Sequence, residues 1–184
     1  MQVTGAWRKN LATPAIIIMN HTSALDIPVL EALLDGSPFT WFSKASYTAI
    51  PFGGTILKRM HIAVERSRAT SAVKSLKQFV EKAESYRAHM LIFPEGTRSA
   101  DGTLQRFKPG FALAGETTGR PIVPVVAQDV HRILSKHGFL IDSSVKTIKI
   151  TVGEPLVRMV DEPREAFVQR THDQFQALLA HQPH

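Results

Sequence analysis

Short runs of branched and aromatic residues alternate along the chain with longer stretches that repeat apolar residues at helical spacing. Six of these runs are bounded by Gly, Pro, Asn or Ser, which is the pattern of β-strands. The predicted strands are Ala15–Met19, Phe39–Ser43, His61–Val64, Met90–Phe93, Ile122–Ala127 and Thr147–Val152.

Helical periodicity is clearest from Ser71 to Tyr86, where apolar residues recur opposite a lysine-rich face. Weaker helical patterns cover Pro28–Leu34, Gly110–Thr118 and Glu162–His181. The alternation of strands and helices favours an α/β fold, with a mixed, largely parallel sheet flanked by helices on both faces. No repeat, low-complexity run or linker divides the chain, so residues 1–184 are expected to form one domain.

Composition narrows the possible chemistry. A chain of 184 residues with 43% hydrophobic residues can enclose one core. The absence of cysteine excludes disulfides, thiolate metal sites and a cysteine nucleophile. None of the eight histidines pairs with another at His-x-x-x-His spacing, so no metal is expected. The net charge of +6 suits an anionic partner, which could be a phosphate substrate, an anionic bilayer or nucleic acid.

Apolar stretches in this sequence are short. The longest candidate, Ala15–Met19, falls far below the roughly 20 residues that span a bilayer. The residues after Met1 also lack the basic and apolar regions of a signal peptide. No transmembrane segment is therefore expected, and any membrane contact would be peripheral.

The first candidate for chemistry is the stretch Asn20-His21-Thr22-Ser23-Ala24-Leu25-Asp26, which directly follows a strand of buried type. Reactive groups in open α/β sheets collect beyond the carboxyl ends of strands. His21 could act there as a base, with the Asp26 carboxylate holding the other ring nitrogen protonated. The pattern equally fits an Asp26 that only binds free N–H groups in the first turn of a helix, with His21 as a loop residue.

The second candidate is Phe93-Pro94-Glu95-Gly96-Thr97-Arg98-Ser99, again after an apolar strand. Arg98 at such a turn could grip phosphate bidentately. Glu95 would repel a phosphate, so it is expected to orient Arg98, a backbone amide or a substrate hydroxyl. The alternative is a surface turn with a structural Glu–Arg pair.

A third cluster mixes cations with apolar residues from Lys44 through Pro51-Phe52-Gly53-Gly54 to Arg59, followed by Glu65 and Arg66. It could form a lip that meets acyl chains and anionic headgroups together, although core packing is the alternative for most of its apolar residues. The Gly-Gly pair lacks the residues of a P-loop and of a dinucleotide fingerprint, so no nucleotide role is assigned.

Taken together, these segments resemble the lysophosphatidic acid (1-acylglycerol-3-phosphate) acyltransferase family, whose four blocks occur here in the family's order. The stretch from Asn20 to Asp26 resembles the His-x-x-x-x-Asp block, and residues 93–99 match the Phe-Pro-Glu-Gly-Thr-Arg-Ser block. Residues 62–66 resemble a block that ends in Asp-Arg, with Glu65 in place of aspartate, and residues 121–125 resemble the final Pro-centred block. The resemblance spans roughly Val3 to Val152.

The resemblance implies a fold like that of glycerol-3-phosphate acyltransferase and a catalytic pair. His21 would deprotonate the acceptor hydroxyl, which attacks an acyl thioester, and Asp26 would orient and stabilise the imidazole. Arg66 and Arg98 would hold the phosphate, joined by Lys44 and Lys108, which fall where related members carry similar residues. Glu95, Gly96 and Thr97 would support the site.

The resemblance also implies partners and a location. These are a lysophospholipid acceptor, an acyl donor that is either acyl-CoA or acyl carrier protein, no cofactor, and peripheral association with the cytoplasmic side of a membrane. A nucleic-acid partner is not expected, because the cations are scattered and no aromatic-rich binding motif is present. Related proteins usually carry a helical or membrane segment before the strand that ends at Gly5, and the expectation is that this chain lacks it.

Three other functions fit the same residues. An acyltransferase of this kind could act on another lysolipid or on glycerol 3-phosphate instead of 1-acylglycerol-3-phosphate. A thioesterase could use His21 and Asp26 to activate water, because both reactions pass through an oxyanion derived from a thioester. A non-enzymatic module that binds anions or membranes would draw on the positive charge alone. A serine nucleophile is not expected, because Ser23 lacks the Gly-x-Ser-x-Gly elbow.

Overall fold

The computed structural model describes residues 1–44, 61–64, 69–134, 142, 144–145 and 147–180. Within these residues, seven strands form one sheet in the order β1-β7-β6-β2-β5-β3-β4. The strands are β1 Gln2–Thr4, β2 Ile16–Met19, β3 Phe39–Lys44, β4 His61–Val64, β5 His89–Ile92, β6 Ile122–Gln128 and β7 Lys149–Val152.

The direction of the strands divides the sheet into two parts. Strands β2 to β6 run parallel to one another, while β7 pairs antiparallel with β6 and β1 pairs parallel with β7. The predicted mixed, largely parallel sheet is therefore confirmed, and β1 and β7, at one end of the strand order, run opposite to the other five strands.

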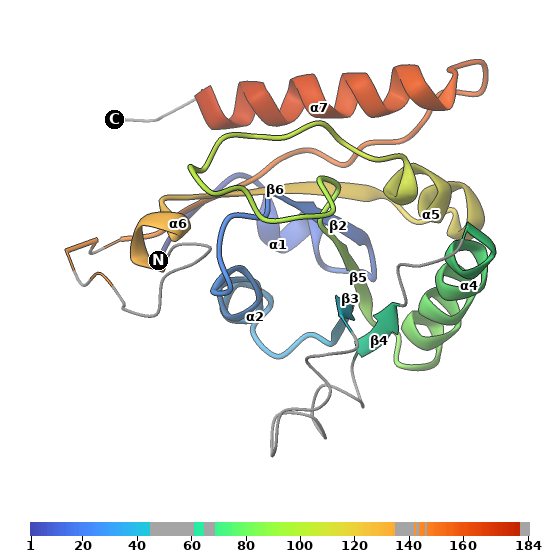
Figure 1. Ribbon diagram of the computed structural model, residues 1–184, viewed down its shortest axis with the longest axis horizontal. Helices are drawn as coiled ribbons and strands as arrows, with labels where there is room; N and C mark the ends of the chain where they lie inside the picture. Colours follow the sequence, from blue (N-terminus) through green and yellow to red (C-terminus); the bar gives the residue numbers. More distant parts are fainter. Residues whose placement is uncertain (45–60, 65–68, 135–141, 143, 146, 181–184) are drawn as a thin grey trace.

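Helices cover both faces of the sheet, as predicted. In Figure 1, α7 and α2 lie on opposite sides of it. Helices α4, α5 and α7 pack together on one face, against strands that include β5, β2 and β6. The helices are α1 Trp7–Asn10, α2 Asp26–Leu34, α4 Ala69–Ser85, α5 Gly110–Thr118, α6 Val130–Ile133 and α7 Arg164–Ala180.

Strand β2 shows how the sequence builds two cores. All four of its residues are buried, so it reads as a continuous apolar run rather than as an alternating one. Because successive side chains point to opposite faces, Ile16 and Ile18 join the core under α4, α5 and α7, while Ile17 and Met19 join the core under α2. This central strand leads directly into His21.

The element predictions fail mainly at ends and in short elements. Strand β7 starts two residues after Thr147, Phe93 lies outside β5, and α2 already begins at Asp26. Helices α1 and α6 were not predicted, because four residues are too few to show a helical repeat. No helix within the described residues is long and apolar enough to cross a membrane.

Candidate active site

The two main motifs meet because β2 and β5 are neighbouring parallel strands. Ile18 pairs with Ile92, so the chain leaves β2 at Asn20 and β5 at Phe93 along the same edge of the sheet. This edge is formed by the carboxyl ends of the parallel strands, where ligands bind in open α/β sheets. The fold thus brings together two segments that are more than 70 residues apart in sequence.

The backbone and ring of His21 are held from the β5 side. Its N–H donates to Glu95 Oε1 at 2.8 Å. Its carbonyl oxygen accepts a hydrogen bond from the Ser99 N–H at 2.7 Å. The imidazole stacks on the Phe93 ring, with 3.8 Å between the ring centroids and 15° between the planes. The His21 side chain keeps 22% of its surface exposed, which leaves it accessible to a substrate.

Asp26 binds the imidazole from the opposite side. Its Oδ2 lies 2.8 Å from His21 Nδ1 and also accepts hydrogen bonds from the backbone N–H groups of Thr22 and Ser23, at 2.8 and 3.0 Å. Asp26 therefore binds backbone amides, as the alternative interpretation required, but these amides precede the helix. The same carboxylate oxygen also contacts the histidine.

This arrangement defines the tautomer of His21. A carboxylate can only accept a hydrogen bond, so Nδ1 carries the proton and Nε2 keeps its lone pair. Nε2 has no hydrogen-bond partner among the described residues. The imidazole is therefore arranged to take up a proton at Nε2, while the fully buried Asp26 carboxylate lies beside the positive charge that would form.

Glu95 links the two loops and is almost fully buried. Besides His21, it accepts a hydrogen bond from the Gln105 N–H at 3.0 Å through Oε2. Burial raises the pKa of Glu95, and the bonds from the His21 and Gln105 amides oppose that shift. The sequence predicts that Glu95 orients Arg98, a backbone amide or a substrate hydroxyl. In the structure its carboxylate binds two backbone amides, those of His21 and Gln105.

Neither hydroxyl next to His21 is bonded to it. Ser23 Oγ donates to the Leu134 carbonyl oxygen at 2.7 Å and accepts from the Leu25 N–H at 3.2 Å. Thr22 Oγ1 is buried and has no hydrogen-bond partner among the described residues. A serine or threonine nucleophile would need its hydroxyl within hydrogen-bond reach of the base, and these contacts do not provide it.

The predicted phosphate-binding residues are only partly described. Arg98 is half-buried one residue before Ser99, and its guanidinium has no ion pair with a described residue. Lys108 is exposed, and its side chain lies across Gly96, where a Cβ atom would come within 2.9 Å of Nζ. Thr97 is exposed on the same turn.

The remaining predicted residues lie at or beyond the end of the described sheet. The backbone of Lys44 ends β3, where it pairs with Val64 of β4. Arg66, Glu65 and most of the third cluster lie outside the described residues. The structure thus brings Arg98 and Lys108 to the edge that carries His21, and places Lys44 at the end of a strand in the same parallel part of the sheet.

Two residues that contact the site have roles that the sequence did not predict. The sequence pattern predicts Phe93 as the end of a strand, yet its ring is the stacking partner of His21. It includes Asn20 in the first motif without a role of its own, yet the Asn20 side chain is buried and bonds the backbone of Ala127. A polar residue that directly follows four buried apolar ones must find hydrogen-bond partners, and this signal could have marked Asn20.

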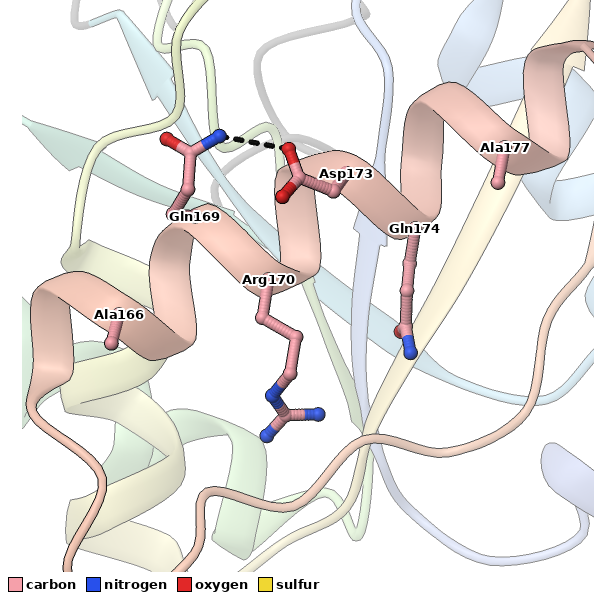
Figure 2. A pocket seen from close by; sticks show the side chains of 6 residues that line it. All are labelled: Ala166, Gln169, Arg170, Asp173, Gln174 and Ala177. Carbon is pink, nitrogen blue, oxygen red and sulfur yellow. Dashed lines mark hydrogen bonds between the residues drawn. The ribbon is translucent and has the colours of Figure 1, made fainter.

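A surface hollow elsewhere on the molecule is formed by one helix. Figure 2 shows Gln169 bonded to Asp173 along α7, and Arg170 pointing away from that pair. None of the residues that line the hollow was predicted to carry chemistry. They are Ala166, Gln169, Arg170, Asp173, Gln174 and Ala177. The described residues also contain no group of His, Asp and Glu side chains that could hold a metal ion.

The protein-family model described as Acyltransferase matches residues 1–128 of this chain. The matched part contains both motifs around His21. The chain belongs to the acyltransferase family.

Curated relatives of this acyltransferase chain carry a common name. It is 32% identical over 137 residues to a 1-acyl-sn-glycerol-3-phosphate acyltransferase of Cocos nucifera, covering 74% of this chain and 44% of that protein. It is 33% identical over 157 residues to a chloroplastic 1-acyl-sn-glycerol-3-phosphate acyltransferase of Brassica napus, covering 83% of this chain and 45% of that protein. The chain thus spans less than half the length of these relatives.

Among solved structures, the fold is similar to that of PlsC, a 1-acyl-sn-glycerophosphate (LPA) acyltransferase from Thermotoga maritima. The TM-score is 0.72 at 22% sequence identity, and the match covers all of this chain and 73% of that one. The acyltransferase-like fold expected from the sequence is therefore confirmed.

Proposed function

We propose that this acyltransferase-family chain transfers a fatty acyl group from an acyl thioester to the free hydroxyl of 1-acylglycerol-3-phosphate, which yields phosphatidic acid. The observation that carries the proposal is the 2.8 Å contact between His21 Nδ1 and the buried Asp26 carboxylate, which leaves Nε2 as a base. The names of the relatives support the choice of acceptor.

In the proposed reaction, His21 Nε2 removes the proton from the acceptor hydroxyl as its oxygen attacks the thioester carbonyl carbon. The tetrahedral intermediate then collapses and the carbon–sulfur bond breaks. The sulfur takes the proton back from His21 and leaves as a thiol. Asp26 stabilises the imidazolium between these steps. General-base assistance supplies about a hundred- to ten-thousand-fold, so most of the remaining acceleration comes from holding both substrates in place.

The acceptor phosphate would bind to the cations of the same edge. Arg98 has its guanidinium free of ion pairs with described residues, and Lys108 lies over the Gly96 turn. Both can form charge-assisted hydrogen bonds to phosphate. Arg66 and Lys44 complete the proposed set by sequence alone. In this proposal the acyl donor is acyl-CoA or acyl carrier protein, and no cofactor takes part. The protein associates peripherally with the cytoplasmic side of a membrane.

Acceptor dependence tests this function. The purified chain is incubated with a palmitoyl thioester, with and without 1-acylglycerol-3-phosphate, and lipids are measured by mass spectrometry. Thioester consumption is expected to rise with the acceptor and to match phosphatidic acid formed. Equal consumption without acceptor would identify a thioesterase instead. The same panel with both donor types and with glycerol 3-phosphate or other lysolipids defines the substrates.

Two variants assign the roles in that assay. His21→Ala is expected to abolish transfer while the circular dichroism spectrum is kept, because the side chain is partly exposed and its loss leaves the backbone bonds in place. Arg98→Ala is expected to raise the KM for the acceptor with a smaller change in kcat. An active His21→Ala protein would contradict the mechanism.

A further inference from the structure

Asn20 occupies the position where β2 stops pairing with its neighbour β6. The last backbone pair of these strands joins Met19 to Val125. One residue later, the Asn20 side chain replaces the backbone: its Nδ2 donates to the Ala127 carbonyl oxygen at 2.9 Å, and its Oδ1 accepts from the Ala127 N–H at 2.9 Å. The amide group therefore continues the contact to β6 after the strand itself has ended.

The next residue is held from the other side of the strand. The His21 N–H and carbonyl oxygen bond to Glu95 and Ser99, which both follow β5. The exit of β2 is thus attached to β6 through one side chain and to the β5 loop through one backbone unit. Such two-sided attachment restricts both translation and rotation of the His21 backbone.

We propose that Asn20 is a positioning residue that sets the place of the His21 imidazole, an inference that rests on the proposed function. Asn20 is 3% exposed, so it acts through the backbone rather than by touching substrate. Without the bonds to Ala127, Asn20 loses its attachment to β6, while the His21 backbone keeps its bonds to Glu95 and Ser99. A misplacement of a reacting group by about 1 Å can cost roughly a hundredfold in rate.

The matched variants are Asn20→Ala and Asn10→Ala. Asn10 is also a buried asparagine, and its Nδ2 donates to the Gly153 carbonyl oxygen at 3.0 Å, away from His21. Asn20→Ala is expected to lower kcat by about tenfold or more, with the KM for the acceptor changed by less than about twofold. Asn10→Ala is expected to keep kcat within about twofold, whatever it costs in stability.

A readout that does not depend on turnover separates this proposal from the proposed function. In protein labelled with nitrogen-15 histidine, the His21 signals, assigned with His21→Ala, report the protonated Nδ1. These signals are expected to shift in Asn20→Ala and to stay in place in Asn10→Ala. If the wild-type chain transfers no acyl group, the proposed function fails, and the spectra still decide the role of Asn20.

Asn20→Asp provides a second variant of the same shape. An ionised aspartate would put an oxygen where Nδ2 donates to Ala127, so the same loss of kcat and the same shift of the His21 signals are expected. Unchanged kcat and unchanged His21 signals in either folded Asn20 variant would overturn the proposal. If neither variant folds, Asn20 is a residue of the fold alone, which also overturns it.

Discussion

His21 is held at four points, by Asp26 five residues further on and by three residues that are more than 70 positions away. Glu95 and Ser99 bind its backbone, Asp26 binds Nδ1, and Phe93 covers one face of the ring. A group held in this way needs little reorganisation when charge develops during a reaction. The contacts leave Nε2 as the single nitrogen of the ring that can take part in proton transfer.

Replacement of Asp26 by asparagine isolates the effect of its charge. Oδ2 makes all three contacts, while Oδ1 is buried and has no partner among the described residues. The amide oxygen of Asp26→Asn can therefore take the Oδ2 position with the loop unchanged. The variant is expected to fold, and its kcat is expected to fall about a hundred- to ten-thousand-fold, because the imidazolium loses its counter-ion.

Steady-state kinetics and circular dichroism check this expectation, with Asp173→Asn as the control. Asp173 is an exposed carboxylate on α7 that accepts one hydrogen bond from Gln169. The control should keep wild-type kcat. A kcat of Asp26→Asn within about twofold of wild type would show that the charge is not needed.

Replacement of Gly96 by alanine tests the position of Lys108. Gly96 has a φ of +72°, and an added Cβ would lie 2.9 Å from Lys108 Nζ. Gly119 has a φ of +66° with no heavy atom within 4 Å of an added Cβ, so it supplies the same backbone strain without the contact. Both alanine variants are expected to lose about 1–2 kcal/mol of unfolding free energy.

Only Gly96→Ala is expected to raise the KM for the acceptor, by severalfold, because it displaces the Lys108 ammonium. Urea unfolding and acceptor titrations measure the two effects separately. An equal KM in the two variants would remove Lys108 from the proposed phosphate site.

At the scale of elements, one helix of the α4–α5–α7 face lies close to the loop that carries Lys108. Phe175 of α7 is fully buried and meets the Phe107 ring edge-on, with 5.1 Å between centroids. Phe107 directly precedes Lys108, whose N–H donates to the Pro94 carbonyl oxygen at 2.8 Å. His172 of α7 also meets the Phe107 ring edge-on, with 4.9 Å between centroids, so helix α7 supports the turn of the second motif through two ring contacts.

The loss of the Phe175 contact should be costly. Phe175→Ala is expected to lower the unfolding free energy by about 3–5 kcal/mol, because it leaves a cavity against Phe107. Val73→Ala on α4 removes an apolar side chain that is 70% exposed, and should change it by less than about 0.5 kcal/mol. Chemical denaturation of the two variants measures the difference. A small loss for Phe175→Ala would mean that α7 contributes little to this face.

Elements of this chain could be predicted where a local pattern was long enough. The strand from Ile16 to Met19 and the helix from Gly110 to Thr118 show their apolar pattern within a few residues. The pairing of β2 between β5 and β6 could not be read in the same way, because it depends on contacts between distant segments. The sequence therefore predicted His21, Asp26 and Glu95 as site residues, but not the Phe93 stack or the Asn20 bonds to Ala127.

At the scale of the whole molecule, a buried histidine makes the stability of the sheet depend on pH. His89 is the first residue of β5, at the opposite end of the parallel strands from His21. Its Nδ1 accepts a hydrogen bond from the Ala15 N–H at 3.1 Å. Burial, reinforced by the positive charge of Arg120, lowers the pKa of His89 from 6.5 to about 4. The folded protein therefore holds this imidazole neutral in a range where the unfolded chain binds a proton.

The unfolding free energy is expected to fall as the pH drops from 6.5 towards 4, with up to roughly 3 kcal/mol assigned to His89. The folded pKa lies below the unfolded one, so this contribution is present above pH 6.5 and is lost on acidification. The raised pKa of Glu95 acts in the opposite direction.

Comparison with His89→Asn isolates the His89 part, because an asparagine oxygen can still accept from Ala15 but does not titrate in this range. Urea unfolding of both proteins at pH 7.5, 6.5, 5.5 and 4.5 provides the measurement. The wild type should lose stability relative to the variant over this series. Parallel pH curves would contradict the assignment.

The attachment of Asn20 to Ala127 also has a consequence for the order of events during folding. The two residues are 107 positions apart, and Ser23 bonds Leu134 across 111 positions. Contacts of such sequence separation form late, since closing a long loop costs entropy before any bond is gained. Helices of a refolding chain should therefore be complete before the end of the sheet that carries His21. The proposed acyl transfer activity would then return more slowly than the far-ultraviolet dichroism signal.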